Sequence, residues 1–174
     1  MPKATLLILG AGGYGLAVAE AAQLGGQWQE IIFADDRWPT TQQVGDYKIV
    51  SNIANLHQLA SSNIQAIVAI GNNHLRQKWQ KLLSELGIII TSIIHPQAIV
   101  SPTAQIGQGV TVMAGCVIST KTVINDGVIL NIGTLLDHDV IIEAFAHLSV
   151  GVKIAGGKII APYSFLEVGS CIPH

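Results

Sequence analysis

The chain has 174 residues, of which 49% are hydrophobic and 11% charged, and its formal net charge is −2. This composition excludes a disordered protein and predicts no nucleic-acid partner, because such partners select a strongly basic surface. Two cysteines are too few for a disulfide framework and lack metal-ligand spacing, so we expect no metal site. No apolar run reaches membrane-spanning length, and residues 5–9 lead into glycines rather than a cleavage site. We therefore expect a cytoplasmic protein without membrane insertion.

The chain begins with a pattern that predicts a nucleotide-binding loop. An apolar strand over residues 4–9 runs into the glycine-rich segment 10–15, and a helix-like stretch over residues 16–22 follows. Glycines allow a tight turn and the close approach of a ligand to backbone N–H groups, and the start of a helix favours anions. A tight turn without a ligand remains the alternative, because one glycine motif alone is weak evidence.

The next predicted strand, over residues 30–34, ends in the acidic pair Asp35 and Asp36. An acidic residue about 20 positions after the glycines is typical of a side chain that binds a ribose hydroxyl. Further strands are expected near residues 47–50 and 66–70, which leaves the first domain too short for a complete dinucleotide-binding fold. We interpret it as a half-sized Rossmann-like domain suited to one nucleotide, which disfavours an NAD-dependent oxidoreductase.

The strand at residues 66–70 leads into Gly71, Asn72 and Asn73, and we expect a helix over residues 75–86 to follow. Because the carboxyl ends of parallel strands share one edge of a sheet, this loop should lie beside the glycine-rich loop. Asparagine side chains there can hydrogen-bond a sugar or a base, or they can cap the helix. The sequence leaves both roles open.

The second half of the chain carries a six-residue repeat. Fourteen positions spaced by six residues are all Ile, Leu or Val: Ile94, Val100, Ile106, Val112, Ile118, Ile124, Leu130, Leu136, Ile142, Leu148, Ile154, Ile160, Leu166 and Ile172. A persistent short period predicts a solenoid, in which each repeat buries its apolar side against its neighbours. Three such faces make a coil of about 18 residues, so residues about 18 apart should stack. Lys158 breaks the column of small residues that lies four positions after these anchors, which suggests a bulge or a swap with Ile159.

One stretch of the repeats carries more than packing requires. His138 lies two places after anchor Leu136, at a corner, and should therefore face away from the apolar interior. Its neighbours Asp137 and Asp139 are acidic, and a carboxylate that orients an imidazole makes a general-base pair. A surface histidine beside two acids is the alternative interpretation.

Three segments, together with the repeats, carry a resemblance to a known family. They are GAGGYG at residues 10–15, FADD at residues 33–36 and IGNNHLR at residues 70–76. With them the chain resembles the left-handed β-helix sugar O- and N-acetyltransferases of the sialic acid O-acetyltransferase and UDP-N-acetylbacillosamine N-acetyltransferase type. The resemblance implies a Rossmann-like α/β domain over residues 1–92 that binds a nucleotide sugar. It also implies a left-handed parallel β-helix over residues 93–174 that binds acetyl-CoA.

The resemblance further implies roles for individual residues. The nucleotide sugar would be bound by Gly12, Gly13, Tyr14, Asp35, Asp36 and Gly71, to which the amide chemistry of Asn73 adds one more candidate. Relatives often carry His at the position of Tyr14. The catalytic pair would be His138 and Asp139, while His147, the N–H of Gly156 and Asn131 would serve the acetyl-CoA. Gly156 follows His138 by about one coil and should lie directly beneath it.

These expectations combine into one function. We expect an acyltransferase that moves an acetyl group from acetyl-CoA to the amine of a nucleotide-linked amino sugar of the UDP-4-amino-sugar type, for surface-glycan or glycoprotein sugar biosynthesis. Acetylation of a sugar or sialic acid hydroxyl is an alternative within the same class. A non-catalytic nucleotide-sugar-binding or scaffold protein with a shortened solenoid is the alternative from another class.

The spacing of two histidines predicts an oligomer. His138 and His147 are half a coil apart and should lie on different sides of the prism, so they can share a site only across subunits. This predicts a homotrimer with sites between its chains. Relatives usually carry further coils beyond the position of His174, so we also expect the solenoid to be truncated at its C-terminal end.

Overall fold

The computed structural model describes residues 3–59 and 63–174. The chain divides into two compact units, Met1–Thr91 and Ser92–His174, which we call the first unit and the second unit. Within the described ranges, neither unit contains a helix that is both long enough and apolar enough to cross a membrane.

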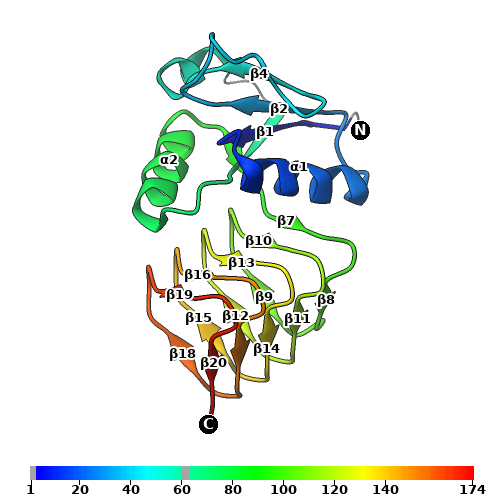
Figure 1. The fold of residues 1–174 in the computed structure, drawn as a ribbon, viewed down its shortest axis with the longest axis vertical. Coiled ribbons are helices and arrows are strands. Elements are labelled where there is room, and N and C mark those ends of the chain that lie inside the picture. Colours follow the sequence, from blue (N-terminus) through cyan, green and yellow to red (C-terminus); the bar gives the residue numbers. More distant parts are fainter. Residues whose placement is uncertain (1–2, 60–62) are drawn as a thin grey trace. The chain divides into compact units, whose positions relative to one another are not determined.

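The first unit is built on a six-stranded sheet with the order β3-β4-β2-β1-β5-β6. Figure 1 labels its neighbouring strands β4, β2 and β1. The strands are β1 (Thr5–Leu9), β2 (Glu30–Ala34), β3 (Gln43–Val44), β4 (Tyr47–Ser51), β5 (Ile64–Val68) and β6 (Ile89–Ile90). The helices are α1 (Gly13–Gly25), α2 (Asn73–Glu85) and the short 3-10 helix η1 (Ile53–Leu59). Every neighbouring pair is parallel except β3 and β4, so the predicted Rossmann-like α/β domain is confirmed.

The central strand β1 positions the functional edge of this sheet. It pairs in parallel with β2 and β5, and Leu9 lies opposite both Ala34 and Val68, the last residues of those strands. Side chains alternate between the two faces of a strand. Leu7 and Leu9 pack in a core that includes residues of α2 and η1. Helix α1 also contacts β1. The loops after β1, β2 and β5 therefore leave the sheet at one edge.

Two boundaries in the first unit differ from those expected. Strand β5 runs over Ile64–Val68 instead of residues 66–70, and α2 begins at Asn73 instead of residue 75. The earlier helix start has a local cause, because Asn72 caps the helix: its Oδ1 accepts the N–H of Leu75 at 2.9 Å. Capping, one of the two roles left open for these asparagines, is thus the role of Asn72.

The second unit is a left-handed parallel β-helix with three faces. The first face contains β7 (Ile93–Ile94), β10 (Thr111–Val112), β13 (Ile129–Leu130), β16 (His147–Leu148) and β19 (Phe165–Leu166). The second face contains β8 (Ile99–Val100), β11 (Val117–Ile118), β14 (Leu135–Leu136), β17 (Lys153–Ile154) and β20 (Cys171–Ile172). The third face contains β9 (Gln105–Ile106), β12 (Val123–Ile124), β15 (Ile141–Ile142) and β18 (Ile159–Ile160).

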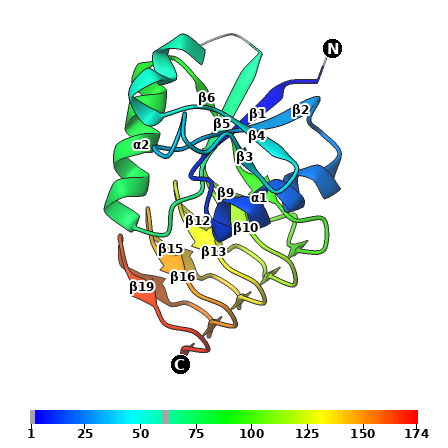
Figure 2. The same cartoon turned by 45° about the horizontal axis from the view of Figure 1, so that its top comes forward.

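The stacking of the coils confirms the period read from the sequence. Leu136 pairs with Ile118 in the preceding coil and with Ile154 in the following coil. Figure 2 shows the strands of successive coils lying side by side. The anchors Ile118, Leu136 and Ile154 are buried in one continuous apolar core. The inward side chains thus exclude water from the prism, and the corners remain available for chemistry.

Two details of the repeats differ from expectation. Ile94 keeps the register of the anchors, opposite Val112, but it is 42% exposed, because it belongs to the first coil and is stacked within the helix on one side only. Lys158 causes neither a bulge nor a swap: Ile141 pairs with Ile159 in unbroken register. The backbone carbonyl of Lys158 accepts the N–H of Ile141 at 2.8 Å, so the coil tolerates the long side chain without changing its hydrogen bonds.

Candidate active site

The corner between β14 and β15 holds an imidazole and a carboxylate in contact. Nδ1 of His138 lies 2.8 Å from Oδ2 of Asp139. Asp139 has a φ of 56°, in the left-handed region. Gly157, at the corresponding position of the next coil, also lies in this region, with a φ of 71°. Aspartate is one of the few residues that adopt this conformation readily. The N–H of Asp139 donates to the carbonyl of Thr120 at 3.0 Å, which fixes the turn that aims the carboxylate at the ring.

The surroundings of His138 make its imidazole a stronger base than an ordinary histidine. Its pKa is raised, first by the hydrogen bond to Asp139 and then by the charge of Asp137, while the positive charge of Lys121 opposes these effects. Asp137 also accepts the backbone N–H of His138 at 2.7 Å through Oδ1. With Nδ1 held by Asp139, the other ring nitrogen, Nε2, is the one left to accept a proton.

The ring of His138 lies against Gly156, one coil further along the chain. A β-carbon added to Gly156 would stand 2.7 Å from Nε2 and 2.8 Å from Cε1 of His138, closer than real side chains approach. The N–H of Gly157 donates to the carbonyl of His138 at 2.9 Å and ties the two corners together. Among the described residues, no acceptor takes the N–H of Gly156. The corner therefore offers a base and a backbone donor side by side.

Two further predicted residues lie on other parts of the β-helix. His147 belongs to β16 on the first face, where it is half-buried and its ring meets that of Phe165 edge-on, with 5.0 Å between centroids. Asn131 follows β13 on the same face, and its Oδ1 accepts the N–H of Ile132 at 2.8 Å. The structure thus brings His138, Asp139 and Gly156 together but places His147 and Asn131 elsewhere on the prism.

In the first unit, the glycine-rich loop forms the start of α1. Gly12 is the N-cap residue and has no side chain with which to cap the helix, and Gly13 begins the helix. Gly12 and Gly13 are exposed and Tyr14 is half-buried. The first turn therefore presents backbone N–H groups and the positive end of the helix dipole at the sheet edge, an arrangement that suits an anion.

Asp35 supports this loop from β2. Its Oδ2 accepts the N–H of Ala11 at 2.8 Å, and its Oδ1 accepts Nε of Arg37 at 2.7 Å. Burial acts to raise the pKa of Asp35, but the hydrogen bonds from Arg37 and Ala11 outweigh burial and hold the pKa below its ordinary value. Asp36 has a separate partner, since its Oδ1 accepts the N–H of Ile53 at 3.2 Å. Both carboxylates thus hold loops in place, and their contact with a nucleotide stays a prediction.

The second predicted loop lies beside the first. The N–H of Ala69 donates to the carbonyl of Leu9 at 2.8 Å, which joins the ends of β1 and β5. Gly71 is exposed, whereas Oδ1 of Asn73 accepts Nη2 of Arg76 at 2.9 Å. Gly71 and Asn73 are thus placed at the same sheet edge as Gly12 and Gly13, where ligands of open α/β sheets bind.

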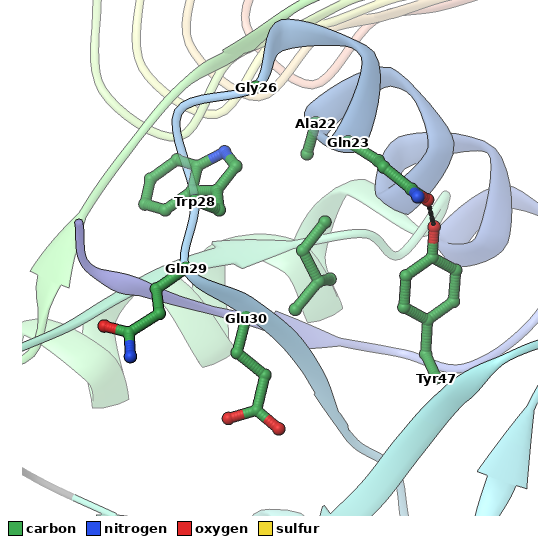
Figure 3. Close-up of a pocket in the computed structure, with 8 residues that line it drawn as sticks. Ala22, Gln23, Gly26, Trp28, Gln29, Glu30 and Tyr47 are labelled. Carbon is green, nitrogen blue, oxygen red and sulfur yellow. Dashed lines mark hydrogen bonds between the residues drawn. The ribbon is translucent and has the colours of Figure 1, made fainter.

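A separate hollow of about 260 Å³ lies at the other end of this unit (Figure 3). It is lined by Trp28, Glu30 and Tyr47, and the hydroxyl of Tyr47 is hydrogen-bonded to Oε1 of Gln23. Glu30 is the first residue of β2, so this hollow lies at the amino end of the strand and is distinct from the loop edge. The part of the chain that the structure describes contains no cluster of three or more side chains suited to a metal ion.

Sequence reasoning missed the roles of two arginines. Nη2 of Arg37 donates to the carbonyl of Ala11 at 2.6 Å, so Arg37 and Asp35 together brace the glycine-rich loop. The spacing of two residues between Asp35 and Arg37 is the sequence signal from which this role could have been predicted. Arg76 stands in the segment IGNNHLR, yet nothing in that segment predicts that its side chain is fully buried.

Known proteins resemble both the first and the second unit of the chain. Residues 5–83 match the family model described as the PglD N-terminal domain. The UDP-N-acetylbacillosamine N-acetyltransferase of Bacillus subtilis (strain 168) is 29% identical over 112 residues, which cover 62% of this chain. The match spans 50% of that curated relative's length.

Two solved structures extend the likeness over nearly the whole chain. The acetyltransferase domain of PglB from Neisseria gonorrhoeae FA1090, in complex with acetyl coenzyme A, is 38% identical with a TM-score of 0.93, over 98% of this chain and 82% of that one. PerB from Caulobacter crescentus, in complex with CoA and GDP-perosamine, is 26% identical with a TM-score of 0.81, over 97% of this chain and 88% of that one. The chain therefore belongs to the left-handed β-helix sugar acetyltransferases whose N-terminal domain is of the PglD type.

Proposed function

We propose that the protein transfers the acetyl group of acetyl-CoA to the amine of a nucleotide-linked amino sugar of the UDP-4-amino-sugar type. The observation that carries this proposal is the corner of the β-helix where His138, oriented by Asp139, lies against the backbone of Gly156. The related proteins support this chemistry. One is named as an N-acetyltransferase, one is in complex with acetyl coenzyme A, and one is in complex with CoA and GDP-perosamine.

His138 acts as the general base. Its Nδ1–H is donated to Asp139, which leaves the lone pair of Nε2 to accept the proton of the attacking amine. As the amine nitrogen bonds to the acetyl carbonyl carbon, the carbon–sulfur bond breaks and Nε2 takes the proton that the nitrogen loses. His138 then returns this proton to the departing thiolate. Asp139 stabilises the imidazolium in between, and no acyl-cysteine is formed.

Gly156 supplies the matching electrophilic contact. Its N–H donates to the carbonyl oxygen of the thioester and stabilises the negative charge that develops on that oxygen during attack. The missing side chain is a requirement of the site, because His138 occupies the space that a β-carbon would fill. His147 and Asn131 complete the site by contacting the acetyl donor and positioning the substrate.

The loop edge of the first unit holds the nucleotide sugar. The N–H groups at Gly12 and Gly13 bind its phosphates, and Tyr14, Gly71 and Asn73 contact the sugar or the base. Asp35 and Asp36 face the ribose from the neighbouring strand. Because Asp35 already accepts hydrogen bonds from Ala11 and Arg37, its main contribution is to hold the loop in its binding conformation.

We further propose that the protein acts as a homotrimer in the cytoplasm, in the biosynthesis of surface glycans. His138 and His147 lie on different parts of one prism, so a site that uses both requires a neighbouring chain. Nucleotide sugars and acetyl-CoA are charged metabolites that do not cross membranes unaided, which supports a cytoplasmic reaction.

The direct test is acetyl transfer to a panel of UDP-, dTDP- and GDP-linked amino sugars. Thiol release would report the rate, and NMR of the product would show whether nitrogen or oxygen carries the acetyl group. Acetyl transfer to an amine, lost in His138→Ala, is the expected outcome. A protein that binds the nucleotide sugar but shows no heat of binding with acetyl-CoA in calorimetry would be a binding or scaffold protein instead.

A further inference from the structure

A buried cation lies directly behind the second loop of the candidate nucleotide-sugar site. Arg76, in the first turn of α2, is 0% exposed. Among the described residues, it is the largest residue whose side chain is fully buried. Burial lowers the pKa of Arg76 to about 10, which still leaves the guanidinium charged at neutral pH. A buried charge is costly unless fixed partners compensate for the lost water.

Three oxygens that accept hydrogen bonds from this guanidinium belong to one segment of the chain. Nη1 of Arg76 donates to the carbonyl oxygens of Ile70 at 2.9 Å and Gly71 at 3.3 Å, and Nη2 donates to Oδ1 of Asn73 at 2.9 Å. These three oxygens come from residues 70–73, which lead from the end of β5 into the first residue of α2. The planar fork of an arginine can hold several oxygens in fixed directions at once, which a lysine cannot do.

The loop that Arg76 holds is also in contact with the glycine-rich loop. A β-carbon added to Gly10 would meet the carbonyl oxygen of Ala69 and Cγ1 of Ile70, each at 3.0 Å. The two loops are therefore packed against one another at Gly10, and a displacement of residues 69–71 would reach the start of α1. Gly71 itself is exposed at the sheet edge.

We infer that Arg76 is a positioning residue for nucleotide-sugar binding, which sets the conformation of residues 70–73 from within the domain and does not touch the substrate. This inference rests on the proposed function, since it assigns a role at the same site. It differs from a purely structural role in one respect: a change at Arg76 should weaken nucleotide binding out of proportion to any loss of stability.

The test compares Arg76→Lys and Arg76→Met with Leu83→Val, a substitution at a fully buried position of α2. Arg76→Lys keeps the charge but cannot span the three oxygens, so KM for the accepted amino sugar should rise by about tenfold, with kcat and KM for acetyl-CoA within about twofold. Leu83→Val should lower the melting temperature and leave both KM values unchanged. Amide exchange of residues 70–73 should be faster in Arg76→Lys than in Leu83→Val.

The inference is overturned if Arg76→Lys raises KM for the amino sugar no more than Leu83→Val does. It is equally overturned if kcat and both KM values change together with the melting temperature. If Arg76→Met does not fold, Arg76→Lys still decides the question. If the wild-type protein acetylates none of the panel, the proposed function fails, and calorimetry with UDP decides the inference: Arg76→Lys should bind UDP about tenfold more weakly, and equal affinity would refute the positioning role.

Discussion

The imidazole of His138 occupies the space that a side chain on Gly156 would need, one coil further along the β-helix. A β-carbon at residue 156 would come within 2.7 Å of Nε2, the nitrogen that Asp139 leaves available. The identity of residue 156 and the position of the base are therefore coupled, because the stacking of the coils fixes the distance between the two corners.

Gly156→Ala should displace the imidazole and lower kcat/KM by about 10²-fold, since a misplaced general base loses most of its effect. Steady-state kinetics would measure the loss. The double variant His138→Ala/Gly156→Ala is the matched control: with the ring gone, the added methyl group has nothing to displace. Strictly additive losses in this double-mutant cycle would contradict the coupling.

His138→Ala should lower kcat by a factor on the order of 10²–10⁴ and leave acetyl-CoA affinity nearly unchanged, because the imidazole moves a proton and does not anchor the donor. His95→Ala offers a control within the same β-helix. His95 sits in the first coil, where its Nδ1 accepts the N–H of Gln97 at 3.0 Å. Turnover in His138→Ala equal to that in His95→Ala would rule out the base.

Asp139→Asn should change the pH dependence of kcat/KM. The hydrogen bond to Asp139 raises the pKa of His138, and the base works only when neutral, so wild-type activity should fall on acidification through a pKa above the ordinary histidine value. Removing the negative charge should lower this pKa and move the acid limb of the profile to lower pH, while the rate on the plateau also drops. Asp137→Asn keeps an oxygen for the N–H of His138 and leaves the largest cause of the raised pKa, the hydrogen bond to Asp139, in place, so its profile should shift less. A shift toward higher pH in Asp139→Asn would contradict the assignment.

Mixing His138→Ala with His147→Ala should restore activity if each site draws one histidine from each of two neighbouring chains. In trimers assembled at random from equal amounts, about a quarter of the interfaces would carry both histidines. The two inactive variants would be unfolded, mixed, refolded and assayed, with light scattering to establish the mass of the assembly. Sites contained within one chain would give no recovery, and a stable, fully active monomer would exclude the trimer altogether.

The sequence predicted the β-helix well because its signal is repeated. Every coil carries the same inward anchors, so an irregular position such as Lys158 cannot shift the register that its neighbours impose. The arrangement of the corner residues was predictable for a related reason, since a period of about 18 residues places Gly156 beneath His138 without any knowledge of the side-chain conformations. Ile94 follows the pattern and is still exposed, because the period does not indicate which coil lacks a neighbour on one side.

The details of the first unit were harder to predict because they depend on single contacts. The start of α2 is set by one capping hydrogen bond from Asn72, which the sequence left as one of two options. The burial of Arg76 runs against the usual preference of arginine for the surface, so no local pattern indicates it. Asp35 was predicted as a nucleotide ligand, and only the structure reveals that Arg37 and Ala11 already engage it.

The left-handed backbone at Asp139 also bears on how such a site could arise. One coil earlier, Lys121 has the same φ of 56° and follows Thr120, which occupies the position equivalent to His138. The backbone at that corner is thus already shaped for an acid–base pair, and neither the strands nor the interior would have to change to accommodate one. A scaffold of this kind can gain, lose or relocate a reactive corner through two or three substitutions, which separates the evolution of its chemistry from that of its architecture.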